Sequence, residues 1–369
     1  MLPMKVLCDR EQLREGLAVV NNVIPPRSTK PVLENVCLVA SDDALELLGT
    51  DLEVAVRYRV GEVKVSEPGL AVIPARVALD FIRDLSSETV ALESADGRCT
   101  ISGGSDSCEL VTLDADEFPV VSRFDEEKTL TIQGGTFTRL VGQTAFAAAR
   151  EAGRYAMHGV LMVMEEGHLK LVGTDGRRLA LSSTPVDQPS EDIKPSILPT
   201  KGIQLFCRVI EDPLDMVQLQ FGENQVGLKS KNAEIFTRLI DGEYPKYTQV
   251  VPSETAHIVE ANADLMGRKL RLVANVTGDE ARAVRFKVER DEIAMFGRSA
   301  GRGEAQAHME VKYDGSGSSI SFNPDYVLDG LKHCDQETLR LEFSDKSSPG
   351  KFCLGENYIY IVMPITIDT

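Results

Sequence analysis

The chain repeats one pattern at domain-sized intervals. Pro74, Pro199 and Pro324 stand 125 residues apart, and an amphipathic segment follows each of them. Solenoid repeats are only about 20–50 residues long, because their units stack on neighbours instead of closing a core. A unit of this greater length can bury a core of its own. The 369 residues are therefore expected to form three copies of one domain.

Two further markers recur with nearly the same offset. Leu48-Gly49-Thr50-Asp51 returns as Val172-Gly173-Thr174-Asp175, and Phe296-Gly297 is a degraded third version. Asp116-Glu117-Phe118-Pro119 returns as Gly242-Glu243-Tyr244-Pro245. Acidic, polar stretches at 122–128 and 253–256 are suited to linkers. We therefore expect domains at residues 1–127, 128–253 and 254–369.

Composition is ordinary for a soluble globular protein. Hydrophobic residues make up 43% and charged residues 26%, and no stretch approaches the ~18 apolar residues of a membrane span. The N-terminus turns charged at Lys5 and lacks the apolar core of a signal peptide, which predicts a cytoplasmic location. Seven cysteines without a Cys-x-x-Cys pair are interpreted as reduced core thiols. Five scattered histidines predict no metal site.

Each third is expected to open with a helix and to carry a second one after its marker proline. Leu13, Leu17, Val20 and Ile24 form one apolar stripe behind Asp9, which is placed to cap the first helix. Asn323 is placed to cap the last one, ahead of Pro324. The six expected helices cover residues 9–24, 75–86, 136–150, 200–211, 261–277 and 323–334.

Charge is divided unevenly between helices and the rest of the chain. The six helical windows hold 12 Lys and Arg against 9 Asp and Glu, so they are net +3 although the chain is −17. Acidity therefore belongs to strands, loops and linkers. If the helices share one surface, that surface is the one suited to face phosphate. A solvated helical face without any partner is the alternative that charge leaves open.

Short strands outnumber the helices. Val54, Val56, Tyr58 and Val60 alternate with polar residues, which is typical of a strand with one buried face. Further strands are expected at 36–40, 45–48, 90–93, 98–102, 107–113, 160–164, 169–172, 217–221, 225–229, 234–239, 293–297, 307–313, 339–343, 351–354 and 358–363. Asp96-Gly97, Gly103-Gly104 and Asp314-Gly315 are read as hairpin turns. The pattern predicts an α+β fold of three repeated domains, each with an antiparallel sheet and two helices.

The repeats, the run Gly173–Leu179 and the C-terminal Tyr360–Ile365 together resemble the bacterial DNA sliding clamps, the beta subunits of DNA polymerase III. The resemblance covers the entire chain. It implies the DNA clamp fold and a head-to-tail homodimer whose six domains close into a ring, with helices lining the hole and sheets outside. Such a ring encircles duplex DNA and tethers the replicative polymerase as a processivity factor. It is not an enzyme and needs no cofactor.

The same resemblance implies a partner-binding groove between the second and third domains. This groove takes linear peptides from the polymerase, the clamp loader and repair proteins. The matching residues here are Met157, Thr174, Gly176, Arg178, Leu179, Pro245, Val250, Asn323, Tyr326, Met363, Pro364 and Ile365. The apolar ones are expected to hold aliphatic or aromatic anchors, and Arg178, Asn323 and Tyr326 to supply polar contacts. Plain core packing is the alternative for the apolar ones.

DNA contacts and the dimer joint also carry over from the family. Residues that match or sit beside DNA-touching positions are Arg27, Arg150, Arg154, Tyr155 and Lys201, and Arg76, Arg208 and Arg268 are expected lining charges. Val276 matches a position used at the dimer joint. The chain departs from relatives at Ala156, Ala281 and Thr248-Gln249, which predicts a shallower and less basic groove, and in its extra C-terminal residues 366–369.

Two other classes of protein compete with this interpretation. Asp51 and Asp175 could be catalytic carboxylates, and Gly297–Gly303 could pass for a phosphate loop. The loop lacks the Gly-Lys-Ser/Thr ending of a nucleotide site, and aspartates at equivalent places in two repeats indicate turns that order backbone amides. The second rival is a repeat scaffold that never meets nucleic acid, which the acidic net charge favours slightly.

Overall fold

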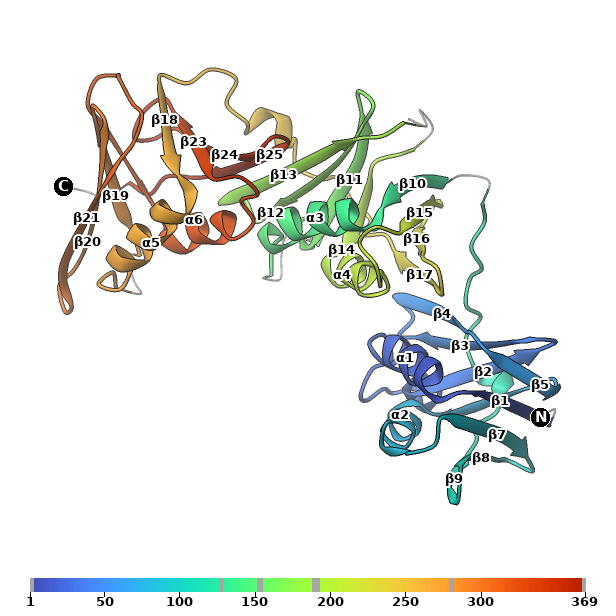
Figure 1. Cartoon of the computed structure of the whole chain (residues 1–369). Helices are drawn as coiled ribbons and strands as arrows, with labels where there is room; N and C mark the ends of the chain where they lie inside the picture. Colours follow the sequence, from blue (N-terminus) through green and yellow to red (C-terminus); the bar gives the residue numbers. More distant parts are fainter. Residues whose placement is uncertain (1–2, 127–128, 151–154, 188–192, 279–281, 367–369) are drawn as a thin grey trace. The chain divides into compact units, whose positions relative to one another are not determined.

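The computed structural model describes residues 3–126, 129–150, 155–187, 193–278 and 282–366 (Figure 1). The chain forms two compact units, and the second copy of the repeat contributes to both. One unit consists of Met1–Phe137 and Lys201–Leu239. The other consists of Thr138–Thr200 and Ile240–Thr369.

The first unit contains two antiparallel sheets, of order β5-β1-β7-β8-β9 and β10-β15-β16-β17-β4-β3-β2-β6. Their strands are β1 (Met4–Asp9), β2 (Asn35–Ser41), β3 (Ala44–Thr50), β4 (Val54–Val60), β5 (Val63–Glu67), β6 (Gly69–Pro74), β7 (Thr89–Ala95), β8 (Arg98–Gly103), β9 (Asp106–Val111), β10 (Thr129–Gln133), β15 (Met216–Phe221), β16 (Gln225–Lys229) and β17 (Ala233–Arg238). Helices α1 (Arg10–Asn21) and α2 (Ala75–Asp84) lie side by side, and α1 packs on β3 and β4 (Figure 1). Most of α4 (Thr200–Arg208) also belongs here.

The second unit has the same design. Its sheets have the orders β14-β11-β12-β13-β25-β24-β23-β18 and β21-β20-β19-β22. The strands are β11 (Gly159–Glu165), β12 (His168–Thr174), β13 (Arg178–Pro185), β14 (Ser196–Pro199), β18 (His257–Asn262), β19 (Val284–Glu289), β20 (Glu292–Ser299), β21 (Gly303–Glu310), β22 (Ser318–Phe322), β23 (Thr338–Phe343), β24 (Gly350–Gly355) and β25 (Tyr358–Val362). Helices α5 (Ala263–Ala274) and α6 (Pro324–Leu331) pack together, and α5 lies on β20 and β21. Most of α3 (Gly134–Thr144) completes this unit.

All six predicted helices are confirmed, each a few residues shorter than its window. The Asp9 carboxylate accepts a hydrogen bond from the Gln12 N–H at 2.9 Å, and Asn323 caps α6 by accepting from the Asp325 N–H at 2.9 Å. The marker prolines are not quite equivalent. Pro74 is the residue before α2, whereas Pro324 is the first residue of α6, where its fixed φ suits the helix and its missing N–H costs nothing.

Two expectations about the strands were wrong. Each third opens with a strand rather than a helix, namely β1, β10 and β18. In β1 the side chains of Met4, Val6 and Cys8 are buried in alternation with outward ones, a short period-two signal ahead of the helical stripe. Asp314-Gly315 does not join a hairpin, because it connects β21 and β22, which lie at opposite ends of their sheet. The other two predicted turns do join neighbouring strands.

The Gly-Thr-Asp marker forms the same turn in the first two copies. The Asp51 Oδ1 atom accepts from the N–H groups of Glu53 and Val54, and Asp175 Oδ1 accepts from those of Arg177 and Arg178. The next residue has a left-handed backbone in both, with φ of 77° at Leu52 and 84° at Gly176. The prediction that these aspartates order backbone amides is confirmed.

The glycine of this marker is a point of close approach in all three copies. A Cβ on Gly49 would collide with α1 at Val20, one on Gly173 with the Thr144 carbonyl oxygen at the end of α3, and one on Gly297 with α5 at Val273. Glycine therefore lets the first helix of each copy settle against its sheet.

The acidic-aromatic-proline marker belongs to connectors that cover the outer faces of two sheets. Phe118 packs against the cluster that includes Cys37, Leu48 and Val72. Tyr244 packs against Leu161, Val172 and Leu179, and its hydroxyl donates to the Val172 carbonyl at 2.9 Å. The recurrence of this marker thus reflects one packing arrangement used twice.

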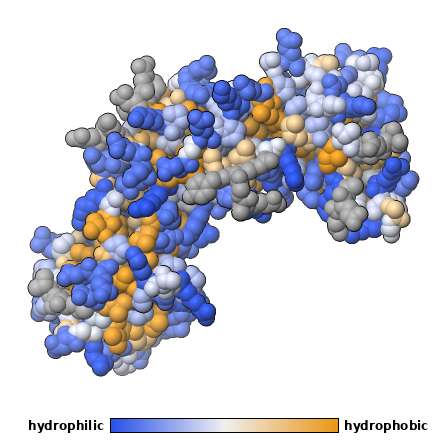
Figure 2. All heavy atoms as spheres, turned by 180° about the vertical axis from the view of Figure 1, so that it is seen from behind, coloured by the Kyte–Doolittle hydropathy of each residue, from blue (hydrophilic) through white to orange (hydrophobic). Residues whose placement is uncertain are grey.

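Hydrophilic residues cover much of the face seen in Figure 2, with apolar residues showing between them. None of the described helices is long and apolar enough to cross a membrane. Cys8, Cys37 and Cys99 are buried and the other four cysteines half-buried, all as free thiols. Burial raises the pKa of the Cys8 thiol to about 12. The interpretation as core thiols therefore holds fully for three of the seven.

Candidate functional site

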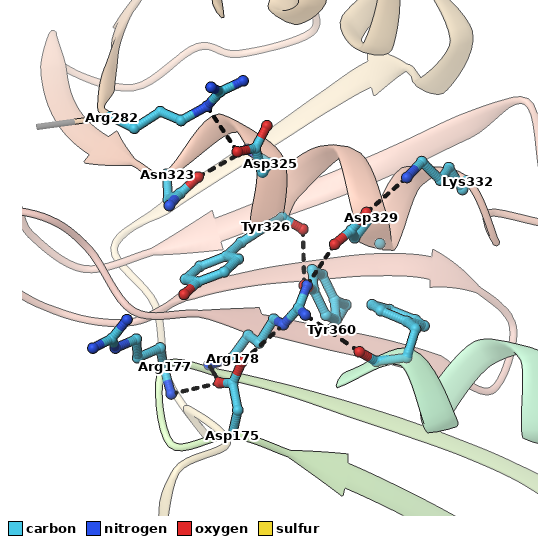
Figure 3. A network of polar contacts seen from close by, with 12 residues as sticks. Asp175, Arg177, Arg178, Arg282, Asn323, Asp325, Tyr326, Asp329, Lys332 and Tyr360 are labelled. Carbon is cyan, nitrogen blue, oxygen red and sulfur yellow. Dashed lines mark hydrogen bonds and ion pairs between the residues drawn. The ribbon is translucent and has the colours of Figure 1, made fainter. Parts of the chain in front are cut away.

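Arg178 is the centre of a polar network in the second unit. The residue starts β13, where it pairs with Val362 of β25, and only 9% of its side chain is exposed. Its Nε donates to Asp175 Oδ2 at 3.1 Å, Nη1 to Asp329 Oδ2 at 2.8 Å, and Nη2 to the Phe146 carbonyl at 3.2 Å (Figure 3). The guanidinium carbon also lies 4.7 Å from the centre of the Tyr326 ring, a cation–π distance.

The network keeps Arg178 charged although it is buried. Burial opposes the charge, but Tyr360, Asp329 and Asp175 outweigh burial and hold the pKa of Arg178 above its usual value. Burial likewise opposes the Asp329 carboxylate, and Lys332 and Arg178 lower its pKa nevertheless. Since all three guanidinium nitrogens donate inside the chain, Arg178 ties β13 to α6 and to the end of α3. The polar contact to a peptide that the sequence suggested for Arg178 stays a prediction.

The other two polar residues predicted for the groove have different fates. The Asn323 side chain is committed to capping α6. In Figure 3 the Tyr326 side chain reaches back from α6 with its ring beside Arg178, and its hydroxyl has no hydrogen-bond partner among the residues that the structure describes. Tyr326 is therefore the better candidate for a polar contact to a ligand.

The apolar groove residues divide into buried and exposed ones. Leu179 is buried in the cluster of Leu161, Val172, Tyr247 and Ile361, so core packing describes it well. Val250 and Met363 remain 37% and 38% exposed. The half-buried remainder consists of Met157, Pro245, Pro364 and Ile365.

The C-terminal segment is held beside the β12–β13 turn. The Met363 N–H donates to the Arg177 carbonyl at 2.9 Å, and the Ile365 N–H donates to the Ser321 carbonyl at 2.8 Å. The structure therefore brings Thr174, Gly176, Arg178 and Leu179 next to Met363. Of the departures from relatives, Ala156 packs on the Leu179 cluster, Thr248 and Gln249 are exposed, and Ala281 lies outside the described residues.

Several predicted DNA-facing residues lie on helices of the first unit. Arg76 on α2 has 80% of its side chain exposed. On α4, Lys201 is paired with Asp51, and Arg208 donates to the Asn22 side chain at the end of α1. Arg27 is exposed in the loop after α1. Lys201 therefore has less free charge to offer than the sequence suggested.

The second unit contains the predicted Arg268 and adds two cations beside it, Lys269 and Arg271, that the sequence prediction missed. Arg268 is exposed on α5, and Lys269 and Arg271 stand on the same helix. None of these three has an acidic partner among the described residues. The sequence does show this group, because Arg268, Lys269 and Arg271 lie within about one helical turn. Arg150 is exposed, whereas Arg154 and the side chain of Tyr155 lie outside the described part of the chain.

Two strand edges and two apolar side chains are candidates for a dimer joint. β9 ends the five-stranded sheet of the first unit, and β21 ends the four-stranded sheet of the second. Val111 on β9 is 65% exposed, and Leu272 on α5 is 57% exposed. Val276, predicted for this joint, is half-buried just after α5. Unpaired strand edges are prone to pairing with another chain.

Comparisons with known proteins cover nearly the whole chain. The N-terminal, central and C-terminal domain families of the DNA polymerase III beta subunit match residues 4–122, 131–246 and 248–365. The beta sliding clamp of Escherichia coli K12 is 31% identical over 99% of this chain and 100% of its own length. The Pseudomonas putida beta sliding clamp is 30% identical with the same coverage.

Solved structures agree. The crystal structure of the DNA polymerase III subunit beta from Pseudomonas aeruginosa superposes with a TM-score of 0.94 at 29% identity, covering 99% of this chain and 100% of that one. The DNA polymerase sliding clamp from Bacillus subtilis gives 0.95 at 25% identity with the same coverage.

The fold and the matches define a three-domain DNA clamp. The chain belongs to the family of the bacterial DNA polymerase III beta subunit, and its function is that of a DNA sliding clamp. The fold class and function predicted from the sequence are thereby confirmed.

Proposed function

We propose that two copies of this chain join head to tail around duplex DNA and tether the polymerase there without catalysis of their own. The joint would pair the β9 edge of one copy with the β21 edge of the other, with Val276 beside it. Pairing would satisfy both rows of free backbone groups and remove both edges from solvent. In this proposal the protein works in the cytoplasm, and its partners are DNA, the polymerase catalytic subunit, the clamp loader and repair proteins.

The observation that carries the partner site is the convergence at the β12–β13 turn. The turn, α6 and the C-terminal segment meet around the Arg178 network, which fixes their mutual positions. Met363 leaves apolar surface exposed there, and the Tyr326 hydroxyl adds a polar group. Val250 is also exposed, and its N–H donates to the carbonyl of Tyr247, a residue of the Leu179 cluster. A rigid site with exposed apolar side chains is suited to short peptides, because the protein loses little conformational entropy when the peptide binds.

A closed ring needs only weak attraction to DNA, because encircling the duplex, rather than binding it tightly, keeps the ring in place. Cations on the helices, with α5 carrying the densest group among those described, give an electrostatic preference for phosphate. An acidic exterior, expected from the net charge of −17, discourages DNA from binding elsewhere.

Retention on DNA of defined topology tests the ring. The protein is loaded onto nicked circular plasmid by a clamp loader and passed through gel filtration at moderate salt. We expect it to stay with the circle, to leave after a single restriction cut, and to have a mass near twice 40.4 kDa when free. Equal retention on the circular and linear forms would show adhesive binding, and a monomeric mass would refute the dimer.

Griselimycin is bound in a solved structure of the P. aeruginosa clamp, and we propose that on this chain it occupies the groove. We expect it to bind this chain with an affinity that falls about tenfold in Met363→Ala. Met216→Ala is the matched control, because Met216 is 59% exposed but lies on β15 of the other unit. Equal affinities for both variants would remove Met363 from the groove. Leu179→Ala should also weaken binding without changing the dimer mass.

The contacts of the residues that suggested an enzyme support the proposed absence of catalysis. In Asp51 and Asp175, one carboxylate oxygen accepts hydrogen bonds from backbone N–H groups of the turn. Gly297–Gly303 spans the end of β20 and the start of β21, a hairpin and not a strand-to-helix phosphate loop. The scaffold interpretation is answered by the family match over the entire chain.

A further inference from the structure

Among the residues that the structure describes, the outer sheet face of the third copy differs from those of the first two in what covers it. In each copy one backbone N–H bonds to the strand before the second helix: Leu113 to the Val72 carbonyl, Ile240 to Ile197 and Ile365 to Ser321. From Leu113 and Ile240 the connectors run on and place Phe118 and Tyr244 on the sheet. After Ile365, only Thr366 remains within the described chain.

A cavity of about 680 Å³ lies on this third face. Phe296 is in its lining, and strand register makes Phe296 the counterpart of Leu48 and Val172, which belong to the clusters under the two connectors. Ile365 and Thr366 line the cavity as well. The cavity therefore lies where the repeat would otherwise place a connector.

Two arginines distinguish this face. Arg285 and Arg298 line the cavity, and neither side chain has an ion pair or hydrogen bond to any residue that the structure describes. By register, Arg285 replaces Cys37 and Leu161, both uncharged. Glu304 is the one acidic side chain among the described residues of the lining. A local excess of positive charge on a chain of net −17 favours an acidic ligand.

The first copy shows how an arginine on this face can hold a peptide segment. Arg57, the register counterpart of Gln306, donates from Nη2 to the Val121 carbonyl of the connector at 3.1 Å. The connector that it holds carries acidic residues directly before Phe118 and a proline directly after it.

We propose that the cavity binds a segment of a partner protein with connector-like chemistry: an aromatic residue, acidic residues before it and a proline after it. The aromatic ring would stack against Phe296, and the acidic residues would pair with Arg285 and Arg298. This proposal rests on the proposed tethering of partner proteins and adds a second site for them beside the groove, because Ile365 belongs to both sites. One partner chain could thus occupy the groove and this cavity together and gain from their linkage.

A labelled peptide copied from the first connector tests the proposal. Fluorescein-tagged Asp114–Val121, DADEFPVV, is titrated with the full-length protein up to about 1 mM while anisotropy is followed. We expect saturable binding that weakens about tenfold or more in the double variant Arg285→Glu/Arg298→Glu. Arg290→Glu is the matched control, because that exposed side chain lies outside the cavity. The same peptide carrying Phe118→Ala should bind weakly to all of them.

Griselimycin separates this test from that of the groove. The double variant should bind griselimycin as the unchanged protein does, which also shows that the variant is folded. No saturable peptide binding, or equal binding to the double variant and the Arg290→Glu control, would overturn the cavity proposal and leave the groove standing. Peptide binding of the expected pattern without griselimycin binding would support the cavity and count against the groove.

Discussion

Replacing Arg178 by methionine measures how strongly its network holds the second unit together. Removing one partner of a buried ion pair costs about 3–5 kcal/mol when the other charge is left alone. Here neither acid is left alone: Asp175 keeps its two backbone N–H donors, and Asp329 keeps Lys332 at 2.7 Å. Asp329 is also one-third exposed, so water compensates it in part. We therefore expect a loss of about 2–3 kcal/mol.

The loss is measurable as a melting shift. In a unit of this size 1 kcal/mol corresponds to about 2–4 °C, so Arg178→Met should lower the Tm by about 4–12 °C. The chain has no tryptophan and 8 tyrosines, so calorimetry is the assay, with hydrogen exchange to locate the effect. Amides of β13 and the start of α6 should lose protection first. Arg177→Met is the control, because Arg177 is the exposed neighbour in the same turn. Equal shifts for both variants would refute the reasoning.

Three further outcomes are expected. Leu52→Gly should raise the free energy of unfolding by about 0.5–1 kcal/mol in thermal melts, because a left-handed backbone costs leucine about 1–2 kcal/mol and glycine only its chain entropy. Burial and the neighbouring Lys332 lower the pKa of His333 below its ordinary value of 6.5, so the unfolded chain binds the proton more tightly than the folded one. The free energy of unfolding, measured with urea, should therefore fall as the pH drops below 6.5, and it should fall less in His333→Gln. Arg268→Glu/Arg271→Glu should weaken binding to linear duplex at low salt by about tenfold, with the gap closing as salt rises, while Lys346→Glu on an exposed loop should not.

Local signals in the sequence were enough to predict the helices and most strands. Three of the helices, α1, α5 and α6, have side-chain caps, and the helices carry apolar stripes, so their presence depends on neighbours along the chain. The opening strands were missed because each is only a few residues long and runs directly into a stronger helical pattern. Asp314-Gly315 shows the converse, since a turn sequence does not reveal which strands it separates.

The sequence predicted which residues belong to the candidate site, but it did not predict what contacts those residues make. Arg178 meets Asp329, a residue 151 positions away, so no local pattern shows that its charge is already satisfied. The covering of outer faces by connectors is likewise a tertiary fact. The recurring acidic-aromatic-proline marker was visible in the sequence, but its purpose required knowing that Phe118 and Tyr244 lie on equivalent sheets.

The two eight-stranded sheets run past the borders of the copies. β4 of the first copy is hydrogen-bonded to β17 of the second, and β13 of the second to β25 of the third. The repeating unit of the sequence and the compact unit of the structure are therefore not the same. An isolated copy would expose an unpaired edge strand where its neighbour's strand had been, and we expect it to aggregate. Deleting one copy would therefore also leave its neighbour with an unpaired strand, so the copies depend on one another for their folded structure.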